Sequence, residues 1–175
     1  MNKIKIHYES AMAYYELAYF IKDYINEHTV ILCIGTDKFI GDCLGPLVGT
    51  FLKKENFPIP IYGTLKEPCH ALNLDEILDT INKKYTDPCI IGIDACIGDE
   101  SAIGELQARD IPIHPGKGVG KSLPKVGDAS IIGIVDNSDG PQFFKQKNIR
   151  LSLVMSMAKV ITDALIHAYY LSQHD

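Results

Sequence analysis

Apolar runs and helical apolar stripes alternate along the first half of the chain. The runs are short and rich in β-branched residues, which is typical of strands buried on both faces of a parallel sheet. Elsewhere apolar residues recur at three- and four-residue steps, which is typical of amphipathic helices. The pattern predicts strands at 29–34, 59–62 and 88–95, and helices at 10–27, 43–55 and 73–85. Strand and helix in alternation predict parallel βαβ units with right-handed crossovers.

The second half of the chain follows a different pattern. It predicts strands at 102–108 and 129–135, a glycine- and proline-rich loop at 112–127 between them, and a final helix at 148–171. We therefore expect an α/β fold, a three-layer α/β/α sandwich with a mostly parallel central sheet (phosphorylase/hydrolase-like). No repeat, low-complexity segment or linker divides the chain, so we expect one domain over 1–175. Within the loop, 115–127 is expected to be less ordered than the sheet.

Composition and charge narrow the functional classes. The chain has 175 residues, 46% of them hydrophobic, which is enough for a sizeable core. A formal net charge of -5 argues against direct binding to nucleic acid and against binding to an acidic membrane surface. No apolar stretch approaches the roughly 20 residues of a membrane span, and 1–10 does not have the pattern of a secretory signal. The five cysteines form no Cys-x-x-Cys pair and predict free thiols in a reducing compartment, hence a cytoplasmic protein.

Two aspartates follow the first and third predicted strands. If these strands are neighbours, Asp42 and Asp94 face one crevice at the carboxyl edge of the sheet. A carboxylate at the edge of the core, as at Asp94, must be paired, hydrogen-bonded or protonated. Two carboxyl groups roughly 3–8 Å apart can share one proton and act as base and acid when water adds to a peptide carbonyl. The alternative is that each aspartate only caps a helix or closes a turn. Asp37, in the same turn as Asp42, fits a turn residue best and is also a substrate-binding candidate.

The glycine-rich loop and one histidine are further candidates. Residues 116–122 approach a phosphate-binding loop, but Pro115 stands at the first glycine position and 123–127 cannot easily begin a helix. A substrate-contacting flap that includes Gly116 and Gly118 is favoured instead. His70 precedes a predicted helix on the same rim as the aspartates and is a substrate-binding candidate. Its alternative is a solvent-exposed or locally hydrogen-bonded histidine.

Nucleophilic catalysis is disfavoured by the pattern. Cys43 lies beside Asp42, but no histidine partner is indicated for it. The Gly-x-Ser-x-Gly signature of serine hydrolases does not occur in the chain. The histidines do not have metal-ligand spacing either, so neither a metal nor another cofactor is expected.

Seven segments of the chain carry a family resemblance: 33–37, 41–50, 62–65, 68–71, 93–96, 115–119 and 151–155. They closely resemble the YyaC family of sporulation proteins from spore-forming Firmicutes, and the resemblance runs from about Thr29 to the final helix. That family looks like a short relative of the spore germination protease, an atypical aspartic endopeptidase that degrades the small acid-soluble proteins coating spore DNA.

The resemblance extends to the motifs that hold the catalytic aspartates of the germination protease. Its Asp-Ala-Leu-Gly-Pro motif is similar to 42–46 and its Ile-Asp-Ala-Leu motif to 93–96, which implies that Asp42 and Asp94 are catalytic. Cys43 departs from the first motif, and the chain is much shorter than that enzyme. More remotely, the chain is similar to hydrogenase-maturation endopeptidases, which place a metal-binding acid at the Asp42 position and an aspartate at the Asp94 position. Their third ligand is a histidine that has no secure counterpart here.

The resemblance implies an aspartic-type endopeptidase of sporulation or germination. Its partner would be a protein or peptide substrate such as the small acid-soluble spore proteins, inside the forespore or spore. Direct nucleic-acid and membrane partners are not expected, and a homo-oligomer stays open. The alternative hypothesis is a catalytically inactive protein-binding module of the same fold, which holds a protein tail in the same crevice.

Overall fold

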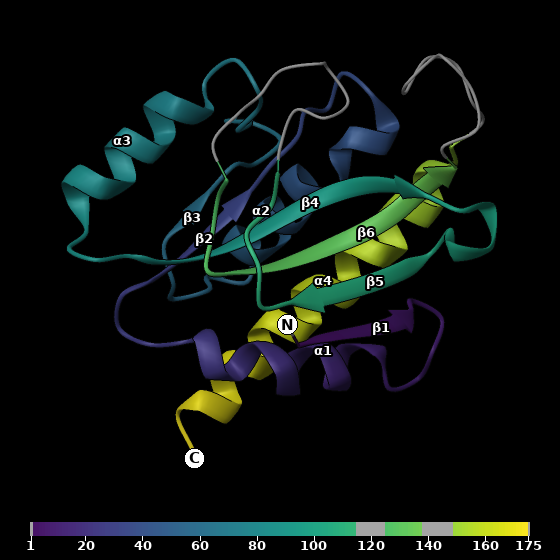
Figure 1. Cartoon of the computed structure of the whole chain (residues 1–175), viewed down its shortest axis with the longest axis horizontal. Helices are drawn as coiled ribbons and strands as arrows, with labels where there is room; N and C mark the ends of the chain where they lie inside the picture. The colour runs from purple at the N-terminus through teal and green to yellow at the C-terminus, as the bar shows by residue number, and fades with distance from the viewer. Residues whose placement is uncertain (1, 115–124, 138–148, 175) are drawn as a thin grey trace.

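The computed structural model describes residues 2–114, 125–137 and 149–174. These residues form a six-stranded mixed sheet and the helices that cover it (Figure 1). The strand order is β1-β5-β6-β4-β2-β3. The strands are β1 (Lys3–His7), β2 (Thr29–Cys33), β3 (Ile61–Tyr62), β4 (Cys89–Gly98), β5 (Glu105–Arg109) and β6 (Ala129–Asn137). The neighbours β3, β2, β4 and β6 run parallel, β5 is antiparallel to β6, and β1 is antiparallel to β5. The predicted α/β fold with a largely parallel sheet is confirmed.

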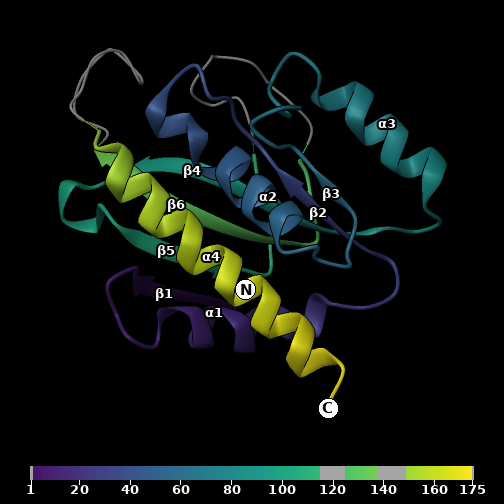
Figure 2. The same ribbon diagram turned by 180° about the vertical axis from the view of Figure 1, so that it is seen from behind.

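The helices cover the two faces of the sheet unequally. They are α1 (Ala13–Ile21), α2 (Leu44–Lys54), α3 (Leu74–Lys84) and α4 (Leu151–Ser172). Helices α1, α2 and α4 pack on one face (Figure 2), and α3 packs on the other, beside β3 and β2. The side chains of the central strands alternate between the two faces. Ile31 and Ile93 pack in the core that α1, α2 and α4 cover, and Leu32 and Ile90 pack in the core beside α3.

Helix α4 is the longest helix of the described residues, and it is rich in apolar side chains. It has 22 residues, and an 18-residue window within it has a mean hydropathy of 1.4, so it is long and apolar enough to cross a membrane by length and composition alone. In the fold, its apolar stripe, which includes Val154, Ile161 and Leu165, is buried against the sheet and against α1 and α2. Its composition is therefore that of a core helix.

Three of the differences from the sequence expectations concern where strands begin and end. No strand was expected near the N-terminus, yet Ile4 and Ile6 of β1 pack on the core and the residues that alternate with them are exposed. Strand β5 begins at Glu105 rather than 102, because Glu100–Ala102 form a 3-10 helix. Strand β4 was expected to end at 95 but continues to Gly98, because β6 offers it a partner beyond the end of β2.

Candidate active site

Asp42 and Asp94 lie at the same edge of the sheet. Strands β2 and β4 are parallel neighbours, and their last pair is Cys33 with Ile93, so Asp94 is the first residue of β4 beyond the end of β2. Asp42 lies in the 3-10 helix Ile40–Cys43 that leads from β2 into α2. The predicted neighbourhood of the first and third strands is therefore confirmed, although Asp94 lies within its strand and not at its end.

A tight turn fixes the backbone at Asp42. The Thr36 N–H donates to the Asp42 carbonyl oxygen at 3.0 Å, and the Asp42 N–H donates to the Phe39 carbonyl. Gly35 has a φ of +135°, and a Cβ there would collide with the Asp42 carbonyl oxygen. The turn after β2 can therefore close against the 3-10 helix only because residue 35 has no side chain.

Both carboxyl groups hold their protons more tightly than usual. Burial raises the pKa of Asp42 to about 6, and the Thr36 backbone N–H opposes part of that rise. The pKa of Asp94 is raised well above its usual value by burial, and further by the charge of Asp42. The Ala95 N–H, which donates to Asp94 Oδ1 at 2.8 Å, and the charge of Arg109 act in the opposite direction.

The two aspartates therefore titrate in order. Asp42 loses its proton first, and its charge then makes ionisation of Asp94 harder. Near neutral pH Asp42 is a carboxylate, because its pKa is raised only to about 6, and both aspartates are partly exposed. This electrostatic coupling agrees with carboxyl groups that face one crevice. The separation of roughly 3–8 Å stays a prediction.

Arg109 acts on Asp94, and Asp94 in turn acts on Cys69; the sequence patterns pointed to neither Arg109 nor Cys69. Through Ser130 of β6, the register places Arg109 of β5 on the same face of the sheet as Gly92, two residues along β4 from Asp94. Arg109 Nε is buried without a hydrogen-bond partner. The period of two over 105–109, in which polar Glu105, Gln107 and Arg109 alternate with apolar residues, is the signal that could have found Arg109.

Cys69 lies beside the end of β2, where it forms a bridge with Ile34. Burial raises its pKa to about 12, and the charge of Asp94 adds to the rise. Cys43 is also buried, and its pKa is raised by burial and by the charges of Asp37 and Asp42. Both are therefore protonated thiols near neutral pH, which speaks against either one as a nucleophile.

The remaining predicted site residues have different surroundings. Asp37 is exposed in the turn. His70 is partly buried, and its Nδ1 accepts the Leu72 N–H at 3.4 Å while its own backbone N–H donates to Asn73 Oδ1 at 2.8 Å. His70 therefore orders the approach to α3, and its substrate-binding role stays a prediction. Gly116 and Gly118 lie outside the described residues, as does most of the predicted flap.

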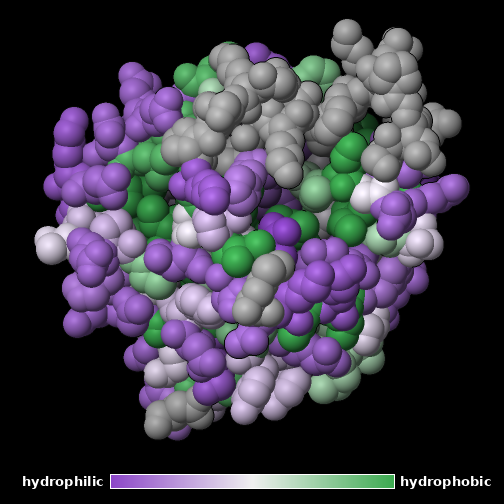
Figure 3. All heavy atoms as spheres, viewed as in Figure 1, coloured by the Kyte–Doolittle hydropathy of each residue, from purple (hydrophilic) through white to green (hydrophobic). Residues whose placement is uncertain are grey.

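A cleft of about 860 Å³ runs along the free edge of β3, below α3. Residues 57–64 form one wall, and His70, Ile77 and Tyr85 contribute to the rest. Hydrophobic atoms reach the surface beside α3, between hydrophilic ones (Figure 3). In the sequence, Cys69 lies between two residues of the cleft lining, Pro68 and His70. The charge of Asp94 raises the pKa of the Cys69 thiol. The cleft therefore ends close to the aspartates, which themselves do not line it.

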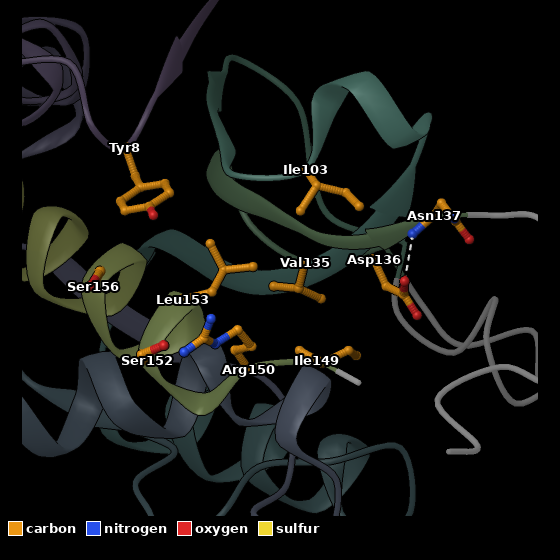
Figure 4. Close-up of a pocket in the computed structure, with 10 residues that line it drawn as sticks. All are labelled: Tyr8, Ile103, Val135, Asp136, Asn137, Ile149, Arg150, Ser152, Leu153 and Ser156. Carbon is orange, nitrogen blue, oxygen red and sulfur yellow. Dashed lines mark hydrogen bonds between the residues drawn. The ribbon is translucent and has the colours of Figure 1, made fainter. Parts of the chain in front are cut away.

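A second cleft, of about 760 Å³, lies between the end of β6 and the start of α4. Tyr8 and Ile103 face Leu153 and Val135 across it (Figure 4). Neither aspartate lines this cleft, and Val135 belongs to the core face opposite to α3. Its position separates it from the aspartate pair.

No group of three or more His, Cys, Asp or Glu side chains within 2–114, 125–137 and 149–174 is arranged to hold a metal ion. Asp42 and Asp94 are thus two acidic groups whose described neighbours are backbone amides, a thiol and a guanidinium. The arrangement suits proton transfer to and from a bound reactant.

Three comparisons with known proteins bear on the resemblance drawn from the motifs. The family described as "Protein of unknown function (DUF1256)" matches residues 5–164. "Uncharacterized protein YyaC" of Bacillus subtilis (strain 168) is 45% identical over 137 residues, which cover 78% of this chain and 67% of that protein. The [NiFe] hydrogenase maturation protease HycI of Thermococcus kodakarensis KOD1 has a similar structure, with a TM-score of 0.50 and 18% identity over 83% of this chain and 98% of that one. The sequence match confirms the predicted relationship to the YyaC family. The match to HycI concerns the fold alone.

Proposed function

The chain belongs to the DUF1256 family, and we propose that it is an aspartic-type endopeptidase in which Asp42 and Asp94 hydrolyse a peptide bond of a protein substrate. The observation that carries the proposal is the position of the two aspartates at one edge of the sheet, where the charge of Asp42 raises the pKa of Asp94 further. In the proposed mechanism an ionised Asp42 is the general base and a protonated Asp94 is the general acid.

The division of roles follows from the order of titration. The Asp42 carboxylate takes a proton from water as the water oxygen bonds to the peptide carbonyl carbon. Asp94 then gives its proton to the amide nitrogen as the carbon–nitrogen bond breaks, which releases a carboxyl group and an amine. A proton passed from Asp42 back to Asp94 restores the starting state. The Arg109 charge, which favours ionised Asp94, stabilises the carboxylate formed when Asp94 donates.

The cleft beside β3 is the proposed seat of the substrate chain. Its apolar wall suits extended polypeptide, and Lys53 and Lys84 add positive charge at its border. His70 belongs to its lining, in keeping with a substrate-binding role. The resemblance to the germination protease makes small acid-soluble spore proteins the first candidate substrate, in the cytoplasm of the forespore or spore. No nucleic-acid or membrane partner is proposed.

The proposal is tested by incubating the purified chain with small acid-soluble spore proteins and identifying the products by mass spectrometry. We expect defined internal cleavages that persist after exhaustive chelation, because a carboxyl pair needs no metal ion. The control is the Asp42→Asn variant prepared in parallel. Bound metal at one ion per chain, with activity lost on chelation and regained on its return, would replace the carboxyl-pair mechanism with a metal mechanism.

The second candidate function is an inactive protein-binding module. The observation that favours it is local bonding, because Asp94 accepts the Ala95 N–H and His70 orders the turn before α3. In the same incubation, this function gives a stable complex with uncut spore proteins. Complex formation would then be equal for the wild-type chain and for Asp42→Asn.

The rate of hydrolysis is expected to fall in acid. Asp42 must be ionised to act as base, and its pKa is raised to about 6 by burial. Below that pH, kcat/KM should drop about tenfold for each pH unit, whereas an ordinary aspartate would keep its charge down to about pH 4. The measurement is kcat/KM for one cleaved peptide over the range from about pH 4 to about pH 8. A flat profile down to pH 4 would contradict Asp42 as the base.

A further inference from the structure

Aromatic side chains gather on one surface of the molecule, formed by α1 and the second half of α4. This aromatic patch consists of Met12, Tyr14, Tyr15, Tyr19, His167, Tyr170 and His174. Five of its members belong to the ten large exposed hydrophobic side chains of the described residues, and Tyr19 and Tyr170 are 59% and 57% exposed. So much exposed aromatic surface in one place distinguishes the patch from the scattered apolar residues of an ordinary surface.

The rings of the patch contact one another across the two helices. His167 lies at its centre, with its ring 5.7 Å from those of Tyr14 and Tyr15 and 6.3 Å from that of Tyr170. Tyr15 stacks on Tyr19, and Tyr170 stacks on His174 at 4.2 Å. The Nε2 atom of His167 is buried and has no hydrogen-bond partner. The patch is therefore continuous, and its central polar atom is left unsatisfied.

We infer that the aromatic patch is the interface of a homodimer, in which α1 and α4 of one copy pack on α1 and α4 of the other. Helical spacing supports this packing, because Met12, Tyr15 and Tyr19 form one stripe and His167, Tyr170 and His174 form another. Two neighbouring stripes, docked on their symmetry mates, give a four-helix contact about a two-fold axis.

The chemistry of the patch fits a second copy of itself. Tyrosine rings pack well against other tyrosine rings, and tyrosine is enriched in protein interfaces. The border carries charges of both signs. Glu16 and Asp163 are negative, and Lys22, which lies over the ring of Tyr19, is positive. An acidic lipid surface or a nucleic acid would require positive charge in excess, and a strongly charged protein partner would require one sign.

The size and position of the patch fit a dimer too. Half-exposed aromatic side chains contribute on the order of 100 Å² each, so the patch offers several hundred Å² as the centre of a contact that needs ~800 Å² per partner. Helix α1 and the end of α4 lie on the side of the molecule away from the 3-10 helix that carries Asp42 (Figure 2). The dimer therefore leaves the aspartates accessible, and its existence does not depend on the proposed hydrolysis.

The test is the molar mass of the full chain in solution, measured by sedimentation equilibrium at protein concentrations up to about 100 µM. Two-chain mass is expected for the wild type. Tyr15→Glu and Tyr170→Glu place a charge in the contact and should each weaken the dimer at least ~tenfold. Leu72→Glu is the matched control, because Leu72 is 79% exposed and lies outside the patch, and it should leave the dimer unchanged.

Two results would overturn the inference. One is a wild-type chain that is monomeric at the highest concentration, which would leave the patch to another partner. The other is a dimer that Tyr15→Glu and Tyr170→Glu leave intact or that Leu72→Glu weakens equally. Circular dichroism of every variant distinguishes loss of the interface from loss of the fold.

Discussion

Asp94→Asn and Asp42→Asn are each expected to reduce peptide hydrolysis about 10³-fold, within the range for loss of a general acid or base. Asparagine keeps the size and most hydrogen bonds of aspartate but neither takes nor gives the proton that the reaction moves. The measurement is kcat/KM for one peptide cleaved by the wild-type chain. The double variant should be little slower than the single ones, because each alone already disables the pair.

A matched variant makes this prediction specific. Asp37→Asn removes an exposed carboxylate from the turn that precedes Asp42, and it should keep kcat/KM within a few-fold of the wild type. Equal losses at Asp37 and Asp42 would indicate that the turn as a whole matters and not the pair. Full activity of Asp94→Asn would end the assignment of Asp94 as the acid.

The same two substitutions are expected to stabilise the folded chain near neutral pH. The folded-state pKa of Asp42 is raised from 3.8 to about 6, so the folded chain binds more protons than the unfolded chain between these values. Stability is therefore lost as the pH rises through that window. Above pH 6 the partly buried charge costs roughly 2–3 kcal/mol, which Asp42→Asn should largely restore. Asp94→Asn should act in the same direction, because burial and the Asp42 charge also raise its pKa.

Thermal unfolding of the wild type and the two variants at pH 7 and pH 4 measures this effect. At pH 7 each variant should melt about 5 °C or more above the wild type, and near pH 4 the difference due to Asp42 should be small. An aspartate that only caps a helix or closes a turn would give the opposite sign, because its removal costs stability. The two predictions together separate a catalytic pair from a structural one: a lower rate with higher stability supports catalysis.

The sequence by itself determined the elements whose evidence is local. Continuous apolar runs are enough to identify β2 and β4, because a strand buried on both faces has few polar positions, and the stripes of α3 and α4 follow helical periodicity. Asp42 and Asp94 could be singled out for the same reason, since each interrupts or ends such a pattern. The rule that parallel strands share a carboxyl edge then brought them together.

Only the tertiary structure decided what depends on partners distant in sequence. Strand β1 is short and half polar, and it is stable only because β5 pairs with it; β4 extends past Asp94 only because β6 does. The influence of Arg109 on Asp94, and of Asp94 on Cys69, depends on burial and on charges brought together from separate parts of the chain. The same holds for the order in which the two aspartates ionise. The aromatic patch joins residues some 150 positions apart along the chain by the packing of α1 on α4. Sequence patterns report on neighbours within a few residues, whereas burial and long-range pairing exist only once the chain has folded.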